Sequence, residues 1–140
     1  MKQVPVIFWT GTGNTQMMAD AIAEAINAAG AEAVVKNVSE ISADEAAGYD
    51  ALALGCPAMG AEVLEECEFE PFFTELEGKL AGKKVALFGS YGWGGTYMQD
   101  WEARVKDAGA ELVADGVLAL GAPDDEAMAK LAEAGKLLAE

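Results

Sequence analysis

Three glycine-bearing segments contain the residue types that could bind a ligand. The first, Thr10-Gly11-Thr12-Gly13-Asn14-Thr15, offers three hydroxyls, an amide and two glycines, and it leads into a helical pattern. Backbone N–H groups and the dipole at a helix start can bind phosphate without a cation. The segment lacks the Gly-Lys-Ser/Thr of a Walker A loop, and Gln16 stands where a dinucleotide fingerprint has its third glycine. It predicts a phosphate site, with an ordinary capped turn as the alternative.

The second segment, from Cys56 to Glu62, is small and apolar and then becomes acidic. Met59 could lie against a flat apolar ring, and Gly60 could turn its peptide without a Cβ penalty. The Glu62 carboxylate could accept hydrogen bonds from ring N–H groups. A tight turn before an acidic helix start explains the segment equally well. Cys56 has no base beside it in sequence, so we expect a packing residue rather than a nucleophile.

The third segment, from Gly89 to Tyr97, places Tyr91 and Trp93 among four glycines. Exposed aromatic surface is typical of a binding site, and a lid over a core edge is the alternative. Together the three segments predict a site for a phosphorylated, flat, hydrogen-bonding heterocycle. Because no acid–base pair or activated nucleophile accompanies them, a cofactor would have to supply the chemistry.

These segments follow three of five short β-rich runs that alternate with helical patterns. The runs cover residues 4–9, 33–38, 50–55, 84–89 and 111–120. Five helices are expected between and after these runs. The first has an apolar face from Met18 to Ala29, and the second is short and begins with a capping box at Ser42. The third begins at Pro71, the fourth covers 97–108, and the last begins at Pro123. This alternation predicts a parallel sheet with helices on both faces. Ligands bind such sheets at the carboxyl ends of the strands.

Two details of the elements carry expectations of their own. Pro5 is a poor residue inside a central strand, so we expect it where the first strand begins. In the last helix, Met128, Leu131, Gly135 and Leu138 fall on one face.

Composition excludes several classes of protein. The 140 residues include 24 acidic and 9 basic side chains and no histidine, which gives a formal charge of −15, and 52% are hydrophobic. That hydrophobic content excludes a disordered tail and fits a single domain over residues 1–140. The charge argues against nucleic-acid and anionic membrane surfaces as partners, and no apolar run could span a bilayer.

The histidine and cysteine counts exclude further chemistry. Without histidine or clustered cysteines, neither a zinc site nor a histidine-dependent triad can be built, and we expect no metal. Two cysteines and an N-terminus without a signal-peptide pattern predict a reduced, cytoplasmic protein.

With these motifs in place, the chain resembles the short-chain bacterial flavodoxins over essentially its whole length. The most specific parts are the runs 9–15, 54–60 and 83–94, which occur in the right order and spacing. The resemblance implies a flavodoxin-like doubly wound sheet of five parallel strands, in the order 2-1-3-4-5, with one non-covalently bound FMN. The fifth strand continues directly to the last helix, without the extra loop of long-chain members.

The resemblance also implies which residues bind FMN. Carried over position by position, the cofactor-binding set is Thr10, Gly11, Thr12, Gly13, Asn14, Thr15, Pro57, Ala58, Met59, Gly60, Glu62, Ser90, Tyr91, Gly92 and Trp93. Residues of the first segment would hold the phosphate. No residue of the set would be catalytic.

Members of this set would have different roles around the flavin ring. Met59 would cover one face and Trp93 would stack on the other. The Gly60 peptide would turn toward the protonated flavin N5, and Glu62 would accept from N3–H. Residues 90–92 would contact the pyrimidine edge through backbone groups.

The resemblance implies a low-potential one-electron carrier whose FMN cycles between semiquinone and hydroquinone. An acidic rim disfavours an anionic hydroquinone and steers transient encounters with basic surfaces on redox partners. We expect a monomer. Ala61 stands where these proteins often carry a polar residue, so the energetics of the Gly60 peptide are expected to differ.

Two other classes of protein share this kind of fold. An FMN-dependent NAD(P)H or quinone reductase is the alternative, although such enzymes usually need a longer chain. A phospho-receiver domain is rejected, because Gly55-Cys56 and Thr10-Gly11 occupy the places where it needs acidic residues.

Overall fold

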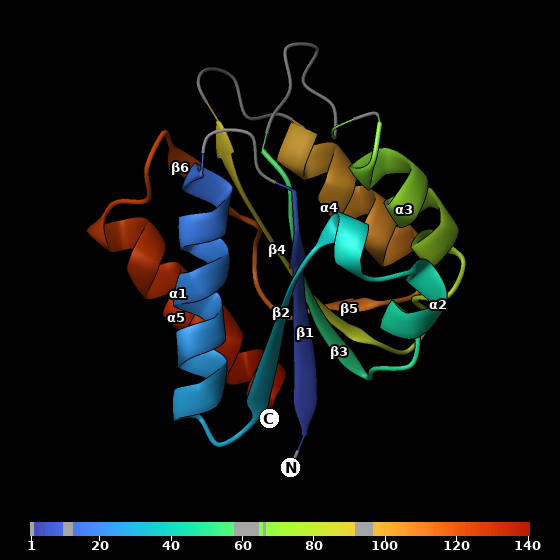
Figure 1. Ribbon diagram of the computed structural model, residues 1–140, viewed down its shortest axis with the longest axis horizontal. Helices are drawn as coiled ribbons and strands as arrows, with labels where there is room; N and C mark the ends of the chain where they lie inside the picture. Colours follow the sequence, from blue (N-terminus) through green and yellow to red (C-terminus); the bar gives the residue numbers. More distant parts are fainter. Residues whose placement is uncertain (1, 10–12, 58–64, 66, 92–96) are drawn as a thin grey trace.

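The computed structural model describes residues 2–9, 13–57, 65, 67–91 and 97–140 (Figure 1). In chain order the elements are β1 (Gln3–Phe8), α1 (Asn14–Ala28), β2 (Glu32–Asn37), the 3₁₀ turn η1 (Val38–Glu40), α2 (Ala43–Ala46), β3 (Ala51–Gly55), α3 (Phe69–Glu77), β4 (Lys84–Tyr91), α4 (Tyr97–Asp107), β5 (Glu111–Leu112), β6 (Val117–Leu120) and α5 (Asp125–Ala139). No helix among these residues is both long and apolar enough to cross a membrane.

All strand pairs in the sheet are parallel, in the order β2-β1-β3-β4-β5, and β6 also pairs with β4. The predicted strand order is therefore confirmed. The parallel direction brings the carboxyl ends of β1, β3 and β4 to one edge of the sheet, at the top of Figure 1.

The two faces of the sheet carry side chains of different size. Val6, Ala53 and Ala86 form a row on one face, where α1 and α5 pack. The next row, Ile7, Leu54 and Leu87, points to the other face, which α2, α3 and α4 cover. Because successive side chains of a strand alternate between faces, one register fixes both cores.

The helices α1 and α5 approach each other closely at Gly135. A Cβ at this position would lie 2.8 Å from the Ile22 carbonyl oxygen and 2.9 Å from the Ala25 Cβ. Leu131 and Leu138 are buried beside it, as the periodicity predicts. Met128 does not belong to this buried face, because its side chain is 42% exposed one turn from the start of α5.

The predicted fifth strand over 111–120 is wrong as one continuous strand. While β4 advances from Val85 to Phe88, the neighbouring chain advances from Leu112 to Val117, two residues further. Gly116 explains the break, because its N–H donates to Glu102 Oε2 of α4 at 2.7 Å rather than to β4. An irregular segment over residues 113–116 therefore separates β5 from β6.

The start of α3 and the position of Pro5 also differ from the predictions. α3 begins at Phe69, so Pro71 is its third residue rather than its first. Proline is tolerated there because the first-turn N–H groups have no partner within the helix. Pro5 lies inside β1, but it precedes Val6, where pairing with β3 begins.

Capping boxes define the two short turns after β2. Ser42 and Glu45 form the predicted box at α2, with the Glu45 N–H donating to Ser42 Oγ at 3.1 Å. Asn37 and Glu40 form a second box at η1, which was not predicted although it has the same spacing.

A charged cluster joins α3 to α4. The Arg104 guanidinium donates to both carboxylate oxygens of Glu70, at 2.8 and 2.9 Å, and to those of Glu77, at 3.0 and 3.1 Å. It also lies 4.7 Å from the centroid of the Phe73 ring. These hydrogen bonds from Arg104 hold the pKa of the Glu70 carboxyl below its usual value.

We predict that Arg104→Met destabilises the protein by about 1–2 kcal/mol near neutral pH, a value reduced by partial solvent exposure. Since the folded pKa of Glu70 is lowered, its contribution is present above the unfolded pKa and lost as the pH falls through the folded pKa. The stability difference between wild type and variant should therefore shrink in acid. Urea unfolding over a pH series measures it.

Lys106→Met is the matched control, because it removes an exposed cation from the same helix. Equal losses of stability in both variants would mean that net charge, and not the Arg104 cluster, is responsible.

Candidate functional site

The three ligand-binding segments predicted from the sequence leave one row of the sheet. Phe8, Gly55 and Phe88 are aligned as neighbours across β1, β3 and β4. The chain remains fastened just beyond this row, since Trp9 N–H donates to Gly55 O at 3.0 Å and Cys56 N–H to Phe88 O at 3.1 Å. The segments therefore start side by side, although they are far apart in sequence.

The start of α1 has the features of an anion site. Gly13 precedes the helix in the left-handed region, with φ of 93°, and among the described residues no side chain caps the first turn. That turn contains no acidic residue, whereas the first turns of α2, α3, α4 and α5 each contain at least one. Backbone N–H groups at such a start attract a negative group.

Thr15 adds a hydroxyl to this helix start. The residue is 1% exposed, and its Oγ1 has no hydrogen-bond partner among the described residues. A buried hydroxyl without a partner is costly, and an oxygen-rich ligand at the helix start would satisfy it. A phosphate fits the residues present.

At the end of β4, Ser90 and Tyr91 are already bonded to the chain after β6. Ser90 Oγ donates to Gly121 O at 2.7 Å, and Gly121 N–H donates to Tyr91 O at 3.0 Å. The pairing of β4 with β3 ends at Phe88, whereas its pairing with β6 runs from Phe88 to Tyr91. The Ser90 hydroxyl is therefore already engaged within the protein, and the expected backbone contacts of residues 90–92 with a ligand remain a prediction.

After β3, the chain passes through Cys56 and half-buried Pro57. Burial, with smaller contributions from the nearby carboxylates of Glu65 and Glu70, raises the pKa of the Cys56 thiol to about 12. The thiolate is therefore not available at neutral pH. Cys56 is a packing residue, as predicted, and not a nucleophile.

Nine of the predicted cofactor-binding residues lie outside the described residues: Thr10, Gly11, Thr12, Ala58, Met59, Gly60, Glu62, Gly92 and Trp93. The remaining six lie at the carboxyl edge of three adjacent strands: Gly13, Asn14, Thr15, Pro57, Ser90 and Tyr91.

Two groups beside this edge were not predicted from the sequence. Trp9 Nε1 donates to Glu68 Oε1 at 3.3 Å, which connects the end of β1 to the start of α3. Glu65 is buried, and its carboxylate accepts the Cys67 N–H at 2.9 Å and the Glu68 N–H. The only sequence signal for these contacts is the crowding of glutamates after residue 61, which also fits a solvated helix start.

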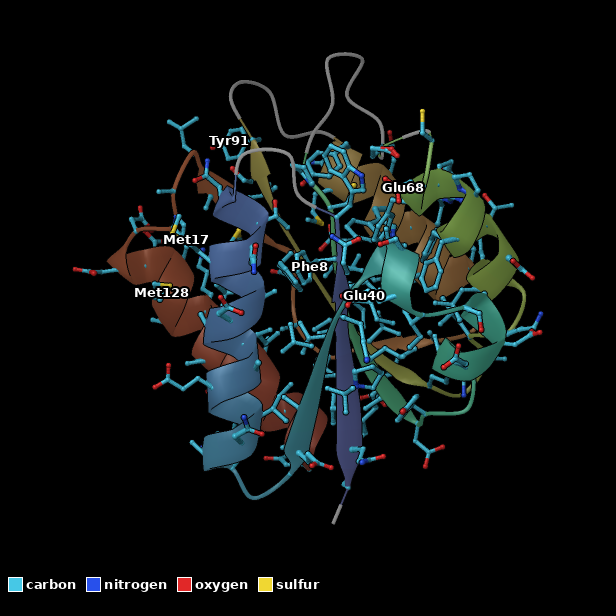
Figure 2. All side chains as sticks on the ribbon, viewed as in Figure 1. Phe8, Met17, Glu40, Glu68, Tyr91 and Met128 are labelled. Atoms are coloured by element: carbon cyan, nitrogen blue, oxygen red, sulfur yellow. The ribbon has the colours of Figure 1, made fainter. Side chains whose placement is uncertain are left out.

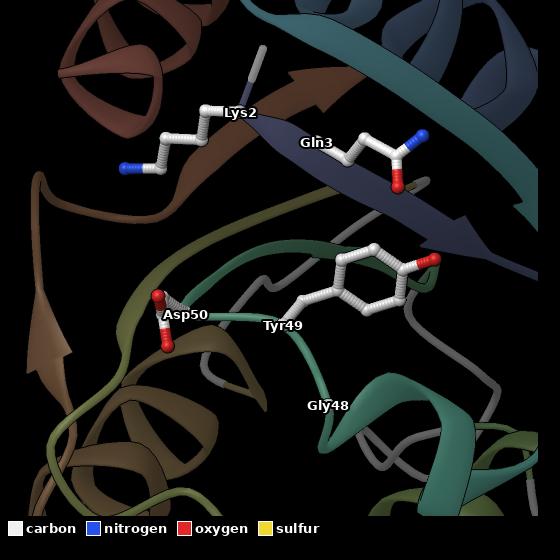
Figure 3. Close-up of a pocket in the computed structure, with 5 residues that line it drawn as sticks. All are labelled: Lys2, Gln3, Gly48, Tyr49 and Asp50. Carbon is white, nitrogen blue, oxygen red and sulfur yellow. The ribbon is translucent and has the colours of Figure 1, made fainter.

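A cavity of about 280 Å³ lies at the opposite edge of the sheet (Figure 3). It is lined by Lys2 and Gln3 at the start of β1, and by Gly48, Tyr49 and Asp50 before β3. The Tyr49 carbonyl already accepts Lys83 Nζ at 2.8 Å. This cavity shares no residue with the predicted site.

Comparison with known proteins identifies the family. Residues 6–135 match the family model described as Flavodoxin. A flavodoxin of Clostridium beijerinckii is 48% identical over 135 residues, covering 96% of this chain and 97% of that protein. A flavodoxin of Megasphaera elsdenii is 47% identical over 116 residues, covering 82% and 85%.

The fold agrees with this family. The solution structure of the two-electron reduced Megasphaera elsdenii flavodoxin superposes with a TM-score of 0.90 at 44% identity, covering 97% of this chain and 98% of that one. By sequence and by fold, the chain belongs to the short-chain flavodoxins, electron-transfer proteins that bind FMN and are not enzymes.

Proposed function

We propose that this flavodoxin is a low-potential one-electron carrier whose FMN cycles between semiquinone and hydroquinone. The observation that supports it best is the start of α1, where a partnerless buried Thr15 hydroxyl lies in the one described first turn of an α-helix without an acidic residue. In a protein of charge −15, that turn is suited to a dianionic phosphate.

The proposed site keeps the roles implied by the family resemblance. Residues 10–15 bind the phosphate, Met59 and Trp93 cover the two faces of the ring, Gly60 and Glu62 bond to its N5 and N3 positions, and residues 90–92 face its pyrimidine edge. Pro57 and Ala58 complete the set. FMN when bound supplies the electron-accepting chemistry, and the protein's residues bind and orient it.

The domain and its setting are part of the same proposal. Residues 1–140 form a single domain, and the protein acts as a monomer in the cytoplasm. Support for the setting comes from Cys56 and Cys67, which are both free thiols, since disulfides are rare in that compartment.

The proposed partners are redox proteins with basic docking surfaces. The net charge of −15 attracts such surfaces over a distance limited by salt. Close contact also needs apolar surface, and three of the exposed large hydrophobic residues lie at the carboxyl end of the sheet. They are Met17 (46% exposed), Met128 (42%) and Leu120 (66%).

Met17 and Met128 lie at a similar height on adjacent helices. α1 and α5 both follow strands of a parallel sheet, and they touch where Gly135 meets Ile22. Met17 lies five residues before Ile22 in α1, and Met128 lies seven residues before Gly135 in α5. Figure 2 shows both methionines on the same flank of the molecule. Exposed acids at 124–126 lie at the start of α5, just before Met128. This apolar patch with an acidic rim complements an apolar patch with a basic rim.

We predict that Thr15→Val weakens FMN binding about tenfold or more, because a hydrogen bond to a charged phosphate is lost. Riboflavin, which lacks the phosphate, should bind the variant and wild type equally. Quenching of flavin fluorescence by apoprotein measures both affinities. Thr74→Val, whose hydroxyl bonds Glu70 on α3, is the control. Unchanged FMN affinity in Thr15→Val would exclude the phosphate role.

We expect stepwise anaerobic reduction of the FMN-loaded protein to accumulate a blue neutral semiquinone before full reduction. Negative charge around the cofactor disfavours the anionic fully reduced form, so added salt should raise the potential of the second step. Visible absorbance during reduction at several salt concentrations records both the accumulation of the blue form and the potential of the second step. Direct bleaching without the blue form would contradict the one-electron proposal and favour a two-electron reductase.

We predict that the double variant Met17→Gln and Met128→Gln transfers electrons to a basic acceptor about threefold to tenfold more slowly. Cytochrome c, with its lysine-ringed haem edge, is the probe, and stopped-flow absorbance gives the rate constant. Val35→Gln is the matched control, because Val35 is 39% exposed on the distant strand β2. Equal slowing by the control, or a rate that rises with salt, would contradict the docking proposal.

A further inference from the structure

Cys56 connects three parts of the fold through its polar groups. Its N–H donates to Phe88 O of β4 at 3.1 Å. Its carbonyl accepts a hydrogen bond, at 2.8 Å, from the hydroxyl of Tyr97, which is the first residue of α4. Its Sγ accepts the Glu65 N–H at 3.3 Å. The residue is fully buried, so these contacts are protected from water.

The partners of Cys56 stand at the ends of two ligand-binding segments. In sequence, the segment 57–64 begins directly after Cys56, and Glu65, the residue that follows it, donates its N–H to Cys56 Sγ. Residues 92–96 end where Tyr97 bonds to Cys56. One residue therefore fixes both ends of the first segment and the far end of the second.

We propose that Cys56, Glu65 and Tyr97 are positioning residues that form a latch between the two segments bracketing the flavin. None of the three is proposed to touch FMN. The inference rests on the proposed function, because its effect on the cofactor requires that these segments bind the flavin ring.

The latch is closed through two helices. The Glu65 carboxylate accepts the Cys67 and Glu68 N–H groups, and its carbonyl accepts the Glu70 N–H at 2.7 Å, so Glu65 fixes the start of α3. α3 in turn contacts α4, where the Phe69 and Trp101 rings pack edge to face with their centroids 5.4 Å apart. Tyr97, at the start of α4, bonds back to Cys56. The contacts among Cys56, Glu65, α3 and α4 therefore form a closed loop, in which each residue is held by its neighbours.

Two further observations fit this latch. A side chain at Gly89 would overlap both the Tyr97 hydroxyl and the Cys56 carbonyl, so the bond between them needs glycine beneath it. The Cys56 thiol remains neutral because its pKa is raised to about 12. A neutral thiol can accept the Glu65 N–H while donating to Pro57 O, at 3.6 Å, and it adds no charge beside the flavin.

The first test is Tyr97→Phe in the full-length, FMN-loaded protein. Loss of one hydrogen bond should raise the FMN dissociation constant about threefold to tenfold and change it unequally for oxidised and reduced cofactor, which shifts the midpoint potentials. Tyr49→Phe at the opposite edge and Val105→Ala, buried in the same helix, are the controls.

The two controls separate positioning from general stability. Val105→Ala should lower the unfolding temperature more than Tyr97→Phe does, because it opens a core cavity, yet leave FMN affinity and potentials unchanged. If Val105→Ala changes the potentials as much as Tyr97→Phe, or Tyr97→Phe changes neither property, the latch is refuted.

The second test needs no cofactor. In the full-length apoprotein, Cys56→Ala should speed hydrogen exchange of the Glu65 amide about tenfold, while Cys56→Ser, which keeps an acceptor, should restore much of the protection. Equal exchange in wild type and Cys56→Ala would overturn the latch. Failure of the wild type to bind FMN would instead refute the proposed function, with the exchange result still standing.

Discussion

A parallel sheet buried on both faces must bring its strands to an end at a common edge, and this site depends on that constraint. Phe8, Gly55 and Phe88 share one row, so the segments that follow them start within reach of each other. This alignment is set by side chains that alternate between the two cores, such as Val6 and Ile7 in β1. If one strand were shifted by one residue against its neighbour, its core side chains would point to the wrong face. Core packing therefore positions the site.

Charge placement selects where on that edge an anion can bind. The acids outnumber the bases by 24 to 9, and the first turns of α2 to α5 contain acids that complement their helix dipoles. α1 lacks such an acid and has instead the unpartnered Thr15 hydroxyl. Among the α-helix starts of the described residues, the start of α1 is therefore the one best suited to a negative ligand.

The sequence predicts local structure well and contacts between distant residues poorly. The parallel sheet followed from the alternation of strand and helix patterns, its strand order from the family resemblance, and the Ser42 capping box from short-range spacing. The Asn37 box could have been found in the same way as the Ser42 box. The break between β5 and β6 could not, because it depends on Glu102, fourteen residues before Gly116. The Cys56–Tyr97 bond spans 41 residues and leaves no periodic signal. Contacts of this kind arise only from packing.

The interrupted outer strand has a consequence for the protein at high concentration. Unpaired strand edges can recruit strands from other chains and so begin aggregation, and long flat edges do so most readily. Here the edge opposite β2 offers two residues in β5 and four in β6, divided by an irregular segment whose Gly116 N–H is bonded to Glu102. This edge of the sheet is therefore a poor template for pairing with a strand of another molecule.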